Sequence, residues 1–406
     1  MAVSSASRAV PAVRLAAWPQ QVPTWLVVLL LGGVALVPRA LGLNDFYTID
    51  EAYHWPARTR AFADAILAHD WARTNQTGHP GVTTMWLGSL GYWLAGWMQI
   101  APPARTGDGT LFLALLRLPL AIANSLAVLG GYALLRRLFA PATAMLAALL
   151  WATAPFLVAH SRVLHLDALL TTCMSLSLLC LLVATAPPTD SAEHAPAQNE
   201  RVTFLSAHPA TFFGSAVFAG LALLTKAPAL ILLPFTGLWM LCAGRSASPI
   251  ERLRRTIISY ALWLGIALLV VFAGWPALWV APREAIASVV EEIVSNGGQP
   301  HVYGNFFLGQ PIDAPGWTFY PLVVAWRMTP LALLGIILAP LAIAMRRGER
   351  RALLGLLLFA LFFLLVMGSE PKEFDRYILP IWPALLVLAA AGLAAPFQLL
   401  ARRVPA

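Results

Sequence analysis

Long apolar stretches, separated by short polar segments, dominate this chain from residue 24 to its end. A helix that crosses a membrane needs about 20 mostly apolar residues, and ten stretches approach that length. They predict spans at residues 24–43, 111–135, 141–159, 166–185, 211–225, 227–243, 257–279, 320–344, 352–368 and 377–399. The pattern therefore predicts an all-α polytopic membrane protein, with residues 1–406 forming a single domain.

The stretch at residues 82–100, "VTTMWLGSLGYWLAGWMQI", is also apolar and competes as an eleventh span. Its three tryptophans and one tyrosine are typical of a helix at the membrane–water interface. A full span here would also reverse the orientation of every later helix. We therefore expect a juxtamembrane helix, with the eleventh span as the alternative.

Charge patterning predicts the orientation of the chain. With ten spans and a cytoplasmic N-terminus, fifteen of the 27 Lys and Arg residues and five of the 19 Asp and Glu residues fall inside. The arginine patches "RRLF", "RLRR", "RRGERR" and "ARR" all lie on that side, as the positive-inside rule requires. The first outer loop is then 44–110, the second is 280–319, and residues 186–210 form a cytoplasmic linker.

Composition agrees with a membrane protein. The chain is 59% hydrophobic and 11% charged, whereas soluble domains have about 25% charged residues. A net charge of +8 would suit nucleic acid only if it formed a basic stripe with interleaved aromatics, which is missing here. Usage rich in Ala, Leu, Arg and Pro, with two lysines, suggests a bacterial cytoplasmic membrane.

The first outer loop begins with "FYTIDEAYHWPART", which places Asp50 beside Glu51 and close to His54. One carboxylate could act as a general base while the other orients a partner or binds a metal. The alternative is structural, with Asp50 as the N-cap of a helix over 51–68.

The segment "HSRVLHLDALLTT" brings Arg162, His165 and Asp167 to the outer end of the fourth predicted span. Ionisable residues at a membrane edge are costly and indicate a functional site by default. The alternative is a structural ion pair between Arg162 and Asp167.

Two further segments carry basic groups. Lys226 interrupts an apolar run where two predicted spans meet, either to bind phosphate or to extend its amine toward lipid headgroups. Arg376 and Tyr377 open the last span after the charged loop "GSEPKEFD", and suit phosphate or sugar recognition. The alternative for this second segment is a solvated loop of mixed charge.

The outer loops hold the remaining candidates. His79 lies in a turn between Gly78 and Gly81, which would present an imidazole and backbone amides. The second outer loop is rich in Gly, Pro and aromatics, as expected for a loop that covers a substrate. It contributes His301 and Tyr303.

Several segments in this order resemble the GT-C superfamily of polyprenyl-phosphate-dependent glycosyltransferases. The similarity is to the branch of protein O-mannosyltransferases and lipid A aminoarabinose transferases. The motifs are "IDEAYH", "HPGVTTMW", "RLPLAIANSLAVLGGYALLRRLF", "RVLHLDALLTT", "LLTKAPAL", "GWTFYPLVVAWRMTP" and "DRYILPIWPALLVLAA". The resemblance implies a GT-C type fold, with about ten spans and extracytoplasmic juxtamembrane helices in the first outer loop.

The resemblance also implies an activity and its residues. Asp50 would deprotonate an acceptor hydroxyl, with Glu51 beside it, and the sugar would be transferred with inversion. Lys226 and Arg376 match positions that stabilise the departing lipid phosphate, with Arg162 as a weaker candidate. The expected partners are a lipid-linked sugar donor, membrane lipids and a lipid, glycan or protein acceptor. Candidate residues for the substrate site are His54, His79, His165, Asp167, Tyr377, His301 and Tyr303.

Some members of the superfamily that the chain resembles bind a divalent metal, and others do not. His54, His79 and Glu51 are the candidate ligands, and no metal is assigned. A transporter or lipid flippase is the alternative function. The charges predicted at one membrane edge and the lack of an inverted repeat favour the enzyme.

Overall fold

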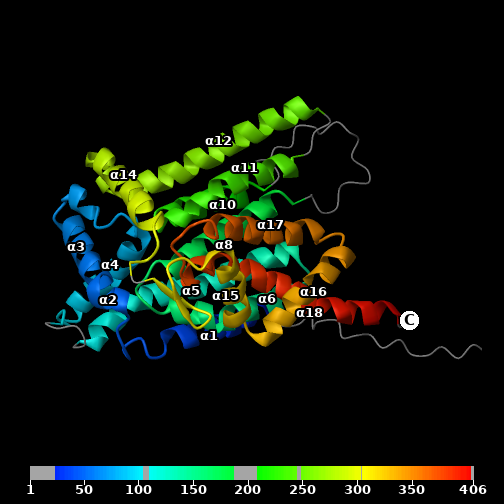
Figure 1. Cartoon of the computed structure of the whole chain (residues 1–406), viewed down its shortest axis with the longest axis horizontal. Coiled ribbons are helices and arrows are strands. Elements are labelled where there is room, and N and C mark those ends of the chain that lie inside the picture. The colour runs from blue at the N-terminus through cyan, green and yellow to red at the C-terminus, as the bar shows by residue number, and fades with distance from the viewer. Residues whose placement is uncertain (1–22, 104–108, 187–207, 245–247, 303, 404–406) are drawn as a thin grey trace, which may run out of the picture.

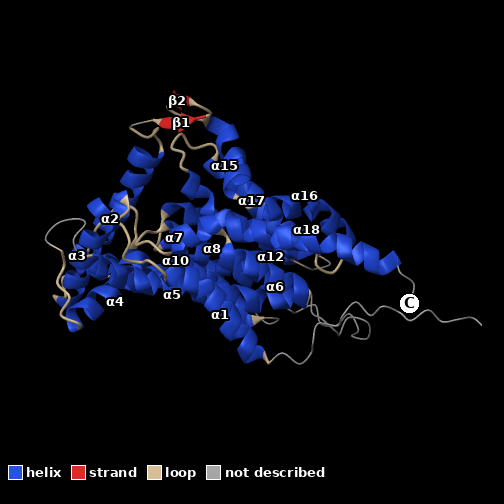
Figure 2. Ribbon diagram, turned by 90° about the horizontal axis from the view of Figure 1, so that it is seen from below, coloured by secondary structure: helices blue, strands red, loops and turns tan. Residues whose placement is uncertain are grey.

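A computed structural model describes residues 23–103, 109–186, 208–244, 248–302 and 304–403 of the chain. The described residues are mostly helical, with one short β-hairpin (Figures 1 and 2). The helices of the first half are α1 (Thr24–Ala40), α2 (Ile49–Tyr53), α3 (Trp55–Leu67), η1 (Trp71–Thr74), α4 (Val82–Trp97), α5 (Thr110–Leu138), α6 (Pro141–Thr153), α7 (Pro155–Ser161) and α8 (Asp167–Ala184).

The second half begins with α10 (Pro209–Leu223), η2 (Ala227–Ile231), α11 (Leu232–Ala243), α12 (Pro249–Gly274), α13 (Ala277–Val280), α14 (Pro282–Glu291) and the π-helical turn η3 (Glu292–Gly297). The hairpin strands β1 (Asn305–Phe307) and β2 (Gln310–Ile312) are antiparallel and lie at one extremity of the molecule (Figure 2). The chain then forms η4 (Gly316–Thr318), α15 (Phe319–Arg327), α16 (Pro330–Met345), α17 (Arg350–Met367), η5 (Asp375–Ile381) and α18 (Trp382–Arg403).

The apolar helices are those of an integral multi-pass membrane protein. Within the described ranges, five helices are long and apolar enough to span a bilayer, or up to seven if each of two bent pairs counts as one span. Three shorter apolar helices lie at 24–40, 209–223 and 227–243. Every predicted span overlaps one of these groups, but the count of ten is not confirmed. The helix α4, at 82–97, belongs to none of them.

The predicted span over 320–344 is sharply bent. The helices there, Gly316–Arg327 and Pro330–Met345, meet at an angle of 118°. Pro330 is the first residue of α16, and Thr329 before it is extended and caps the new helix through its side chain. The residue before a proline is sterically disfavoured from helical geometry, so the chain turns at this point.

The central helix of the bundle is α8, which lies between α5 and α10 and also contacts η5 (Figure 1). All its residues are buried. Small residues allow similarly close packing between α16 and α18. A Cβ built on Gly392 would lie 1.9 Å from the carbonyl oxygen of Gly335, so the two backbones touch without side chains between them.

The helices α3 and α4 pack side by side and run in the same direction. The Trp55 ring lies against Gly81 at their first ends, and the Tyr92 hydroxyl donates a hydrogen bond to Asp64 further along, at 3.2 Å. Gly81 has a left-handed backbone (φ +60°), which glycine adopts without strain and which lets the loop turn into α4. The predicted turn at 78–81 is therefore confirmed.

Candidate active site

Four separate segments of the chain bring charged residues together. Asp50 lies in α2, His165 just before α8, Lys226 between α10 and η2, and Arg376 in η5. Together they line or border a cavity of about 340 Å³, which we call the polar cavity. Its lining is Asp50, His54, Trp55, Arg58, Thr77, His79, His165, Leu166, Lys226, Glu292, His301, Lys372, Phe374, Arg376 and Tyr377.

Two carboxylates share the basic groups at the base of this cavity. Asp167 is 1% exposed and lies 2.7 Å from the Lys226 amine, 3.2 Å from His165 Nδ1 and 3.3 Å from Arg376 Nε. Asp50 lies 3.0 Å from Arg376 Nη1 and 3.3 Å from His165 Nε2. His165 and Arg376 therefore bridge the two acids, and Asp50 is the more accessible of them.

These contacts shift the pKa values of Asp50 and His165, both of which lie outside the predicted spans. The hydrogen bond from His165, followed by the charge of Arg376, holds the pKa of Asp50 well below its usual range despite burial. Burial opposes a charge on His165, but the carboxylates of Asp167 and Asp50 outweigh it and raise its pKa. An anionic Asp50 hydrogen-bonded to a protonated imidazole is the state these contacts favour.

Lys226 is fixed by the loop that precedes α4. The backbone N–H groups of Gly81 and Val82 donate to the carbonyls of Thr225 and Leu224 at 3.0 and 2.9 Å. The Lys226 amine lies 4.2 Å from the centre of the Tyr377 ring, a cation–π contact. The side chain is buried in the cavity wall, so the alternative in which it extends to lipid headgroups is wrong.

Glu51 does not reach the polar cavity. It is 1% exposed, and its carboxylate accepts hydrogen bonds from the Arg117 guanidinium at 2.5 and 2.7 Å and from the Leu164 N–H at 2.7 Å. It also completes a capping box with Thr48. The prediction of Glu51 as a catalytic residue or metal ligand is corrected, because no part of its carboxylate faces the cavity.

Thr48, and not Asp50, caps the short helix α2. The predicted helix over 51–68 is also divided at His54, where the backbone leaves helical geometry between α2 and α3. Because the cap is supplied by Thr48, the carboxylate of Asp50 is available to the cavity.

Arg162 is likewise outside the cavity lining. Its guanidinium donates a hydrogen bond to the carbonyl of Leu41, and its three-residue spacing from His165 does not place them on one helix, since α7 ends at Ser161. Asp167 instead pairs with Lys226. The alternative Arg162–Asp167 pair is therefore wrong, and the phosphate role of Arg162 stays a prediction to which its place outside the cavity lining gives no support.

The other three predicted histidines also line the polar cavity. They are His54, His301 and His79, whose Nε2 lies 3.0 Å from Glu292. Burial, and then the charge of the nearby Lys226, lower the pKa of His79, so the imidazole beside Glu292 is neutral. Tyr303 lies outside the described residues.

Sequence reasoning missed three cavity or support residues. Arg58 stacks over the Trp55 ring at 5.3 Å, Glu292 meets His79 from the second outer loop, and Arg117 supports Glu51 from α5. The sequence signal available was an arginine inside a long apolar run, which applies to Arg117 alone.

A second, mostly apolar cavity of about 240 Å³ adjoins the polar one. It runs past η2 and the end of α17, where its apolar walls include Ile231 and Val366. The two cavities share His79, Lys226, Glu292, Lys372 and Tyr377. The two lysines, Lys226 and Lys372, thus lie where a charged space meets an apolar one, which suits an amphipathic ligand.

Among the described residues, no group of three or more His, Cys, Asp and Glu side chains is arranged to hold a metal ion. The metal requirement stays an untested prediction.

One family model and several solved structures are similar to this chain. The model of the dolichyl-phosphate-mannose-protein mannosyltransferase family matches residues 111–191. No curated protein matches the chain by sequence.

Two solved structures of ArnT from Cupriavidus metallidurans are similar. The apo form is 19% identical with a TM-score of 0.60, covering 94% of this chain and 60% of its own. The form bound to undecaprenyl phosphate is 21% identical with a TM-score of 0.57, covering 94% and 61%.

The archaeal oligosaccharyltransferase AglB from Archaeoglobus fulgidus, in complex with an inhibitory peptide and a dolichol-phosphate, is also similar. It is 17% identical with a TM-score of 0.54, covering 94% of this chain and 52% of its own. The chain spans about 60% of the length of ArnT and about half that of AglB. The chain therefore has the GT-C fold of these glycosyltransferases, as the resemblance in its sequence predicted.

Proposed function

We propose that the chain is an inverting glycosyltransferase that moves a sugar from a polyprenyl-phosphate donor to an acceptor hydroxyl on the extracytoplasmic face. The observation that carries the proposal is the meeting of Asp50, Lys226 and Arg376 in a polar cavity that adjoins an apolar one. The bound undecaprenyl phosphate and dolichol-phosphate named for similar structures support the donor class.

Charge at the site favours a phosphate. Four basic residues line the polar cavity: Arg58, Lys226, Lys372 and Arg376. The carboxylates of Asp50 and Glu292 line it too, and the buried Asp167 pairs with Lys226. Positive groups remain in excess, and His165 adds a proton because its pKa is raised. A phosphate between Lys226 and Arg376 would satisfy this excess at the border of the apolar cavity.

The reaction follows from this placement. The donor phosphate lies between Lys226 and Arg376, its prenyl chain in the apolar cavity and its sugar in the polar one. Asp50 accepts the proton of the acceptor hydroxyl, whose oxygen attacks the anomeric carbon. The bond from that carbon to the phosphate oxygen breaks, the configuration inverts, and polyprenyl phosphate leaves with the electron pair. Fixed positive charge at the leaving oxygen stabilises the transition state.

Donor binding would also activate the base. Without ligand, Arg376 contacts both Asp50 and Asp167. A phosphate shares that guanidinium, which weakens its hold on the Asp50 carboxylate and raises the proton affinity of Asp50 toward its ordinary value. The same residue thus links donor binding to proton removal.

The experiment is transfer from a pool of radiolabelled polyprenyl-phosphate sugars by purified protein in liposomes. Lys226→Gln and Arg376→Gln should lower kcat/KM by about 10²-fold or more, because each removes a charge at the departing phosphate. The matched control is Arg162→Gln, whose guanidinium lies outside the cavity lining and should leave transfer unchanged.

Equal activity in all three variants would remove the phosphate role from Lys226 and Arg376. Movement of intact lipid-linked sugar across the membrane without transfer would replace the enzyme by the transporter alternative.

A further inference from the structure

The segment that leads into η5 is held against α15. The helix α15 contacts η5 and lies beside the β-hairpin (Figure 2). The N–H of Gly316, in the turn η4 before α15, donates a hydrogen bond to Glu373 Oε2 at 2.8 Å. At the end of α15, the Arg327 guanidinium lies 2.5 Å from Asp375 Oδ2. The start of η4 and the end of α15 are therefore both joined to residues that closely precede Arg376.

Glu373 is the buried charged residue of this segment. It is 0% exposed, whereas the side chains of Asp375 and Arg376 are 30% and 29% exposed. Within the described part of the chain, no basic side chain forms an ion pair with Glu373, and its Oε1 is buried without a hydrogen-bond partner. Burial raises the pKa of this carboxyl group, against the hydrogen bond from Gly316. Burying a carboxyl group is costly, so the contact with Gly316 is maintained against a cost in stability.

Phe374 connects Glu373 to the polar cavity. Its backbone is extended (φ −132°, ψ 146°), and neighbouring side chains of an extended chain point to opposite sides. Phe374 accordingly lines the polar cavity, whereas Glu373 does not. The Arg376 guanidinium lies over the Phe374 ring, 5.1 Å from its centre, and the His301 ring makes an edge-to-face contact with the same ring at 5.0 Å. A fixed Glu373 therefore fixes the ring against which Arg376 packs.

Arg376 needs such support because its guanidinium contacts two carboxylates, Asp50 at 3.0 Å and Asp167 at 3.3 Å. An arginine side chain has many rotamers, and holding one of them costs conformational entropy. A preformed packing surface lowers that cost at the moment of binding. The Asp375 carboxylate also accepts a hydrogen bond from the Arg376 N–H at 2.8 Å, which fixes the backbone from which the side chain starts.

We propose that Glu373 is a positioning residue for the donor: its hydrogen bond with Gly316 holds Phe374 and Arg376 where the guanidinium meets the donor phosphate. Glu373 itself touches neither donor nor acceptor. The proposal rests on the function proposed above, because it requires that Arg376 binds the phosphate. It also gives α15, which contributes no residue to the lining of the polar cavity, a role in donor affinity.

The test measures the Kd of undecaprenyl phosphate for the full-length protein in lipid nanodiscs. Glu373→Leu removes the acceptor for the Gly316 N–H and should weaken binding about tenfold or more, because the binding group is then misplaced. Glu373→Gln keeps a side-chain oxygen for that N–H and should bind as the wild type does. Equal Kd values for the wild type and Glu373→Leu would overturn the proposal, and so would a Glu373→Gln protein that binds as weakly as Glu373→Leu.

Coupling to Arg376 distinguishes positioning from general stabilisation of the loop. In an Arg376→Gln background, Glu373→Leu should weaken binding no further, because the group that it positions is gone. Phe374→Leu should behave in the same way, and it carries the test if Glu373→Leu does not fold. Losses that add in these double variants would contradict the positioning role.

The same data separate this proposal from the proposed function. Equal Kd values for the wild type and Arg376→Gln would refute the phosphate role of Arg376, and with it the donor site of the proposed function. A loss of affinity in Arg376→Gln without one in Glu373→Leu would refute the positioning role alone.

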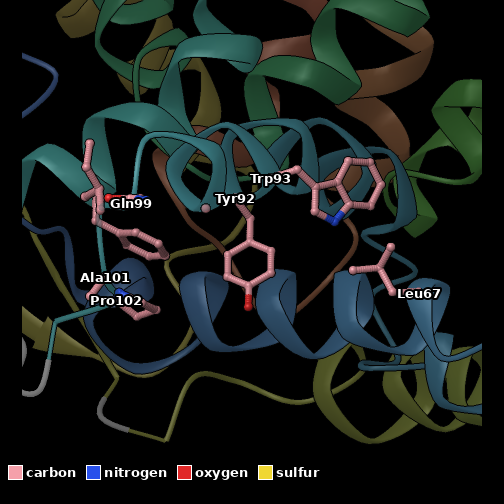
Figure 3. A pocket seen from close by; sticks show the side chains of 9 residues that line it. Leu67, Tyr92, Trp93, Gln99, Ala101 and Pro102 are labelled. Atoms are coloured by element: carbon pink, nitrogen blue, oxygen red, sulfur yellow. The ribbon is translucent and has the colours of Figure 1, made fainter.

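Two variants away from this contact serve as controls. Thr329→Val removes a side-chain oxygen that accepts a hydrogen bond from the Ala332 N–H at the start of α16, at 3.4 Å. Tyr92→Phe removes the hydrogen bond to Asp64, and Tyr92 lines a separate cavity of about 500 Å³ at the far ends of α3 and α4 (Figure 3). Both variants should bind undecaprenyl phosphate as the wild type does. A loss in either control as large as that in Glu373→Leu would show that the effect is not specific to Glu373.

Discussion

Asp50 and Glu51 are neighbours in the chain but face different environments. Glu51 turns inward to Arg117, whose guanidinium also donates to the carbonyls of Leu43 and Phe46 at 2.6 and 2.7 Å. The Glu51 carboxylate also accepts a hydrogen bond from the N–H of Leu164. Glu51 therefore connects the helix that carries Asp50 to Leu164, the residue directly before His165. The buried pair thus sets the distance between the proposed base and its histidine.

Glu51→Gln should destabilise the protein by about 3–5 kcal/mol, because it leaves Arg117 buried without its counter-charge. The measurement is the unfolding free energy in detergent. Glu251→Gln breaks a half-buried pair with Arg255 on one face of α12 and serves as the control, with little change expected. A Glu51→Gln protein as stable as the control would show that the pair does not hold this region together.

His165 predicts a pH dependence. Its pKa is raised in the folded protein by Asp167 and Asp50, against burial and the charge of Arg376. Its contribution to stability is therefore complete below the unfolded value of about 6.5 and is lost as pH rises through the folded pKa. The stability difference between wild type and His165→Asn, followed by thermal midpoint, should shrink above about pH 6.5. A difference that grows with pH would contradict the protonated state.

At the scale of elements, close contacts between the apolar helices α16 and α18 stabilise the fold. Gly392→Val should destabilise the protein by about 1–3 kcal/mol or more, because α16 and α18 must separate to admit the side chain. Gly265→Val in α12, where a Cβ meets no atom within 4 Å, is the control. Thermal unfolding of both variants is the measurement, and equal midpoints would contradict the packing of α16 on α18.

The sequence predicts the apolar helices well because hydrophobic length alone defines them. It also predicts Asp50, Lys226 and Arg376, because charges that interrupt or flank apolar runs are conspicuous. The sequence does not predict contacts between residues that lie far apart in the chain. Glu51 meets Arg117 from another helix, and Glu292 meets His79 from another loop, so neither pairing has a local signal. The 118° bend before α16 has no signal in the apolar pattern either, because the helices on both sides of it are apolar.

At the scale of the whole molecule, the arrangement predicts which residues face outside. Tyr53 is 75% exposed near the polar cavity, and Arg347 is exposed in the turn between α16 and α17. In a Cys242→Ala background, Tyr53→Cys should react with a membrane-impermeant maleimide on intact cells. Arg347→Cys should react only after permeabilisation. The reverse pattern would place the polar cavity on the cytoplasmic face.

The central claim is that Asp50 removes the proton of the acceptor while a lipid phosphate departs. The most direct measurement is sugar transfer by wild type and Asp50→Asn in liposomes, with binding of polyprenyl phosphate measured on the same samples. Asp50→Asn should lower transfer by about 10²–10⁴-fold, the contribution of a general base, and still bind the lipid phosphate. Equal transfer by the two proteins would contradict the claim and assign proton removal to another group.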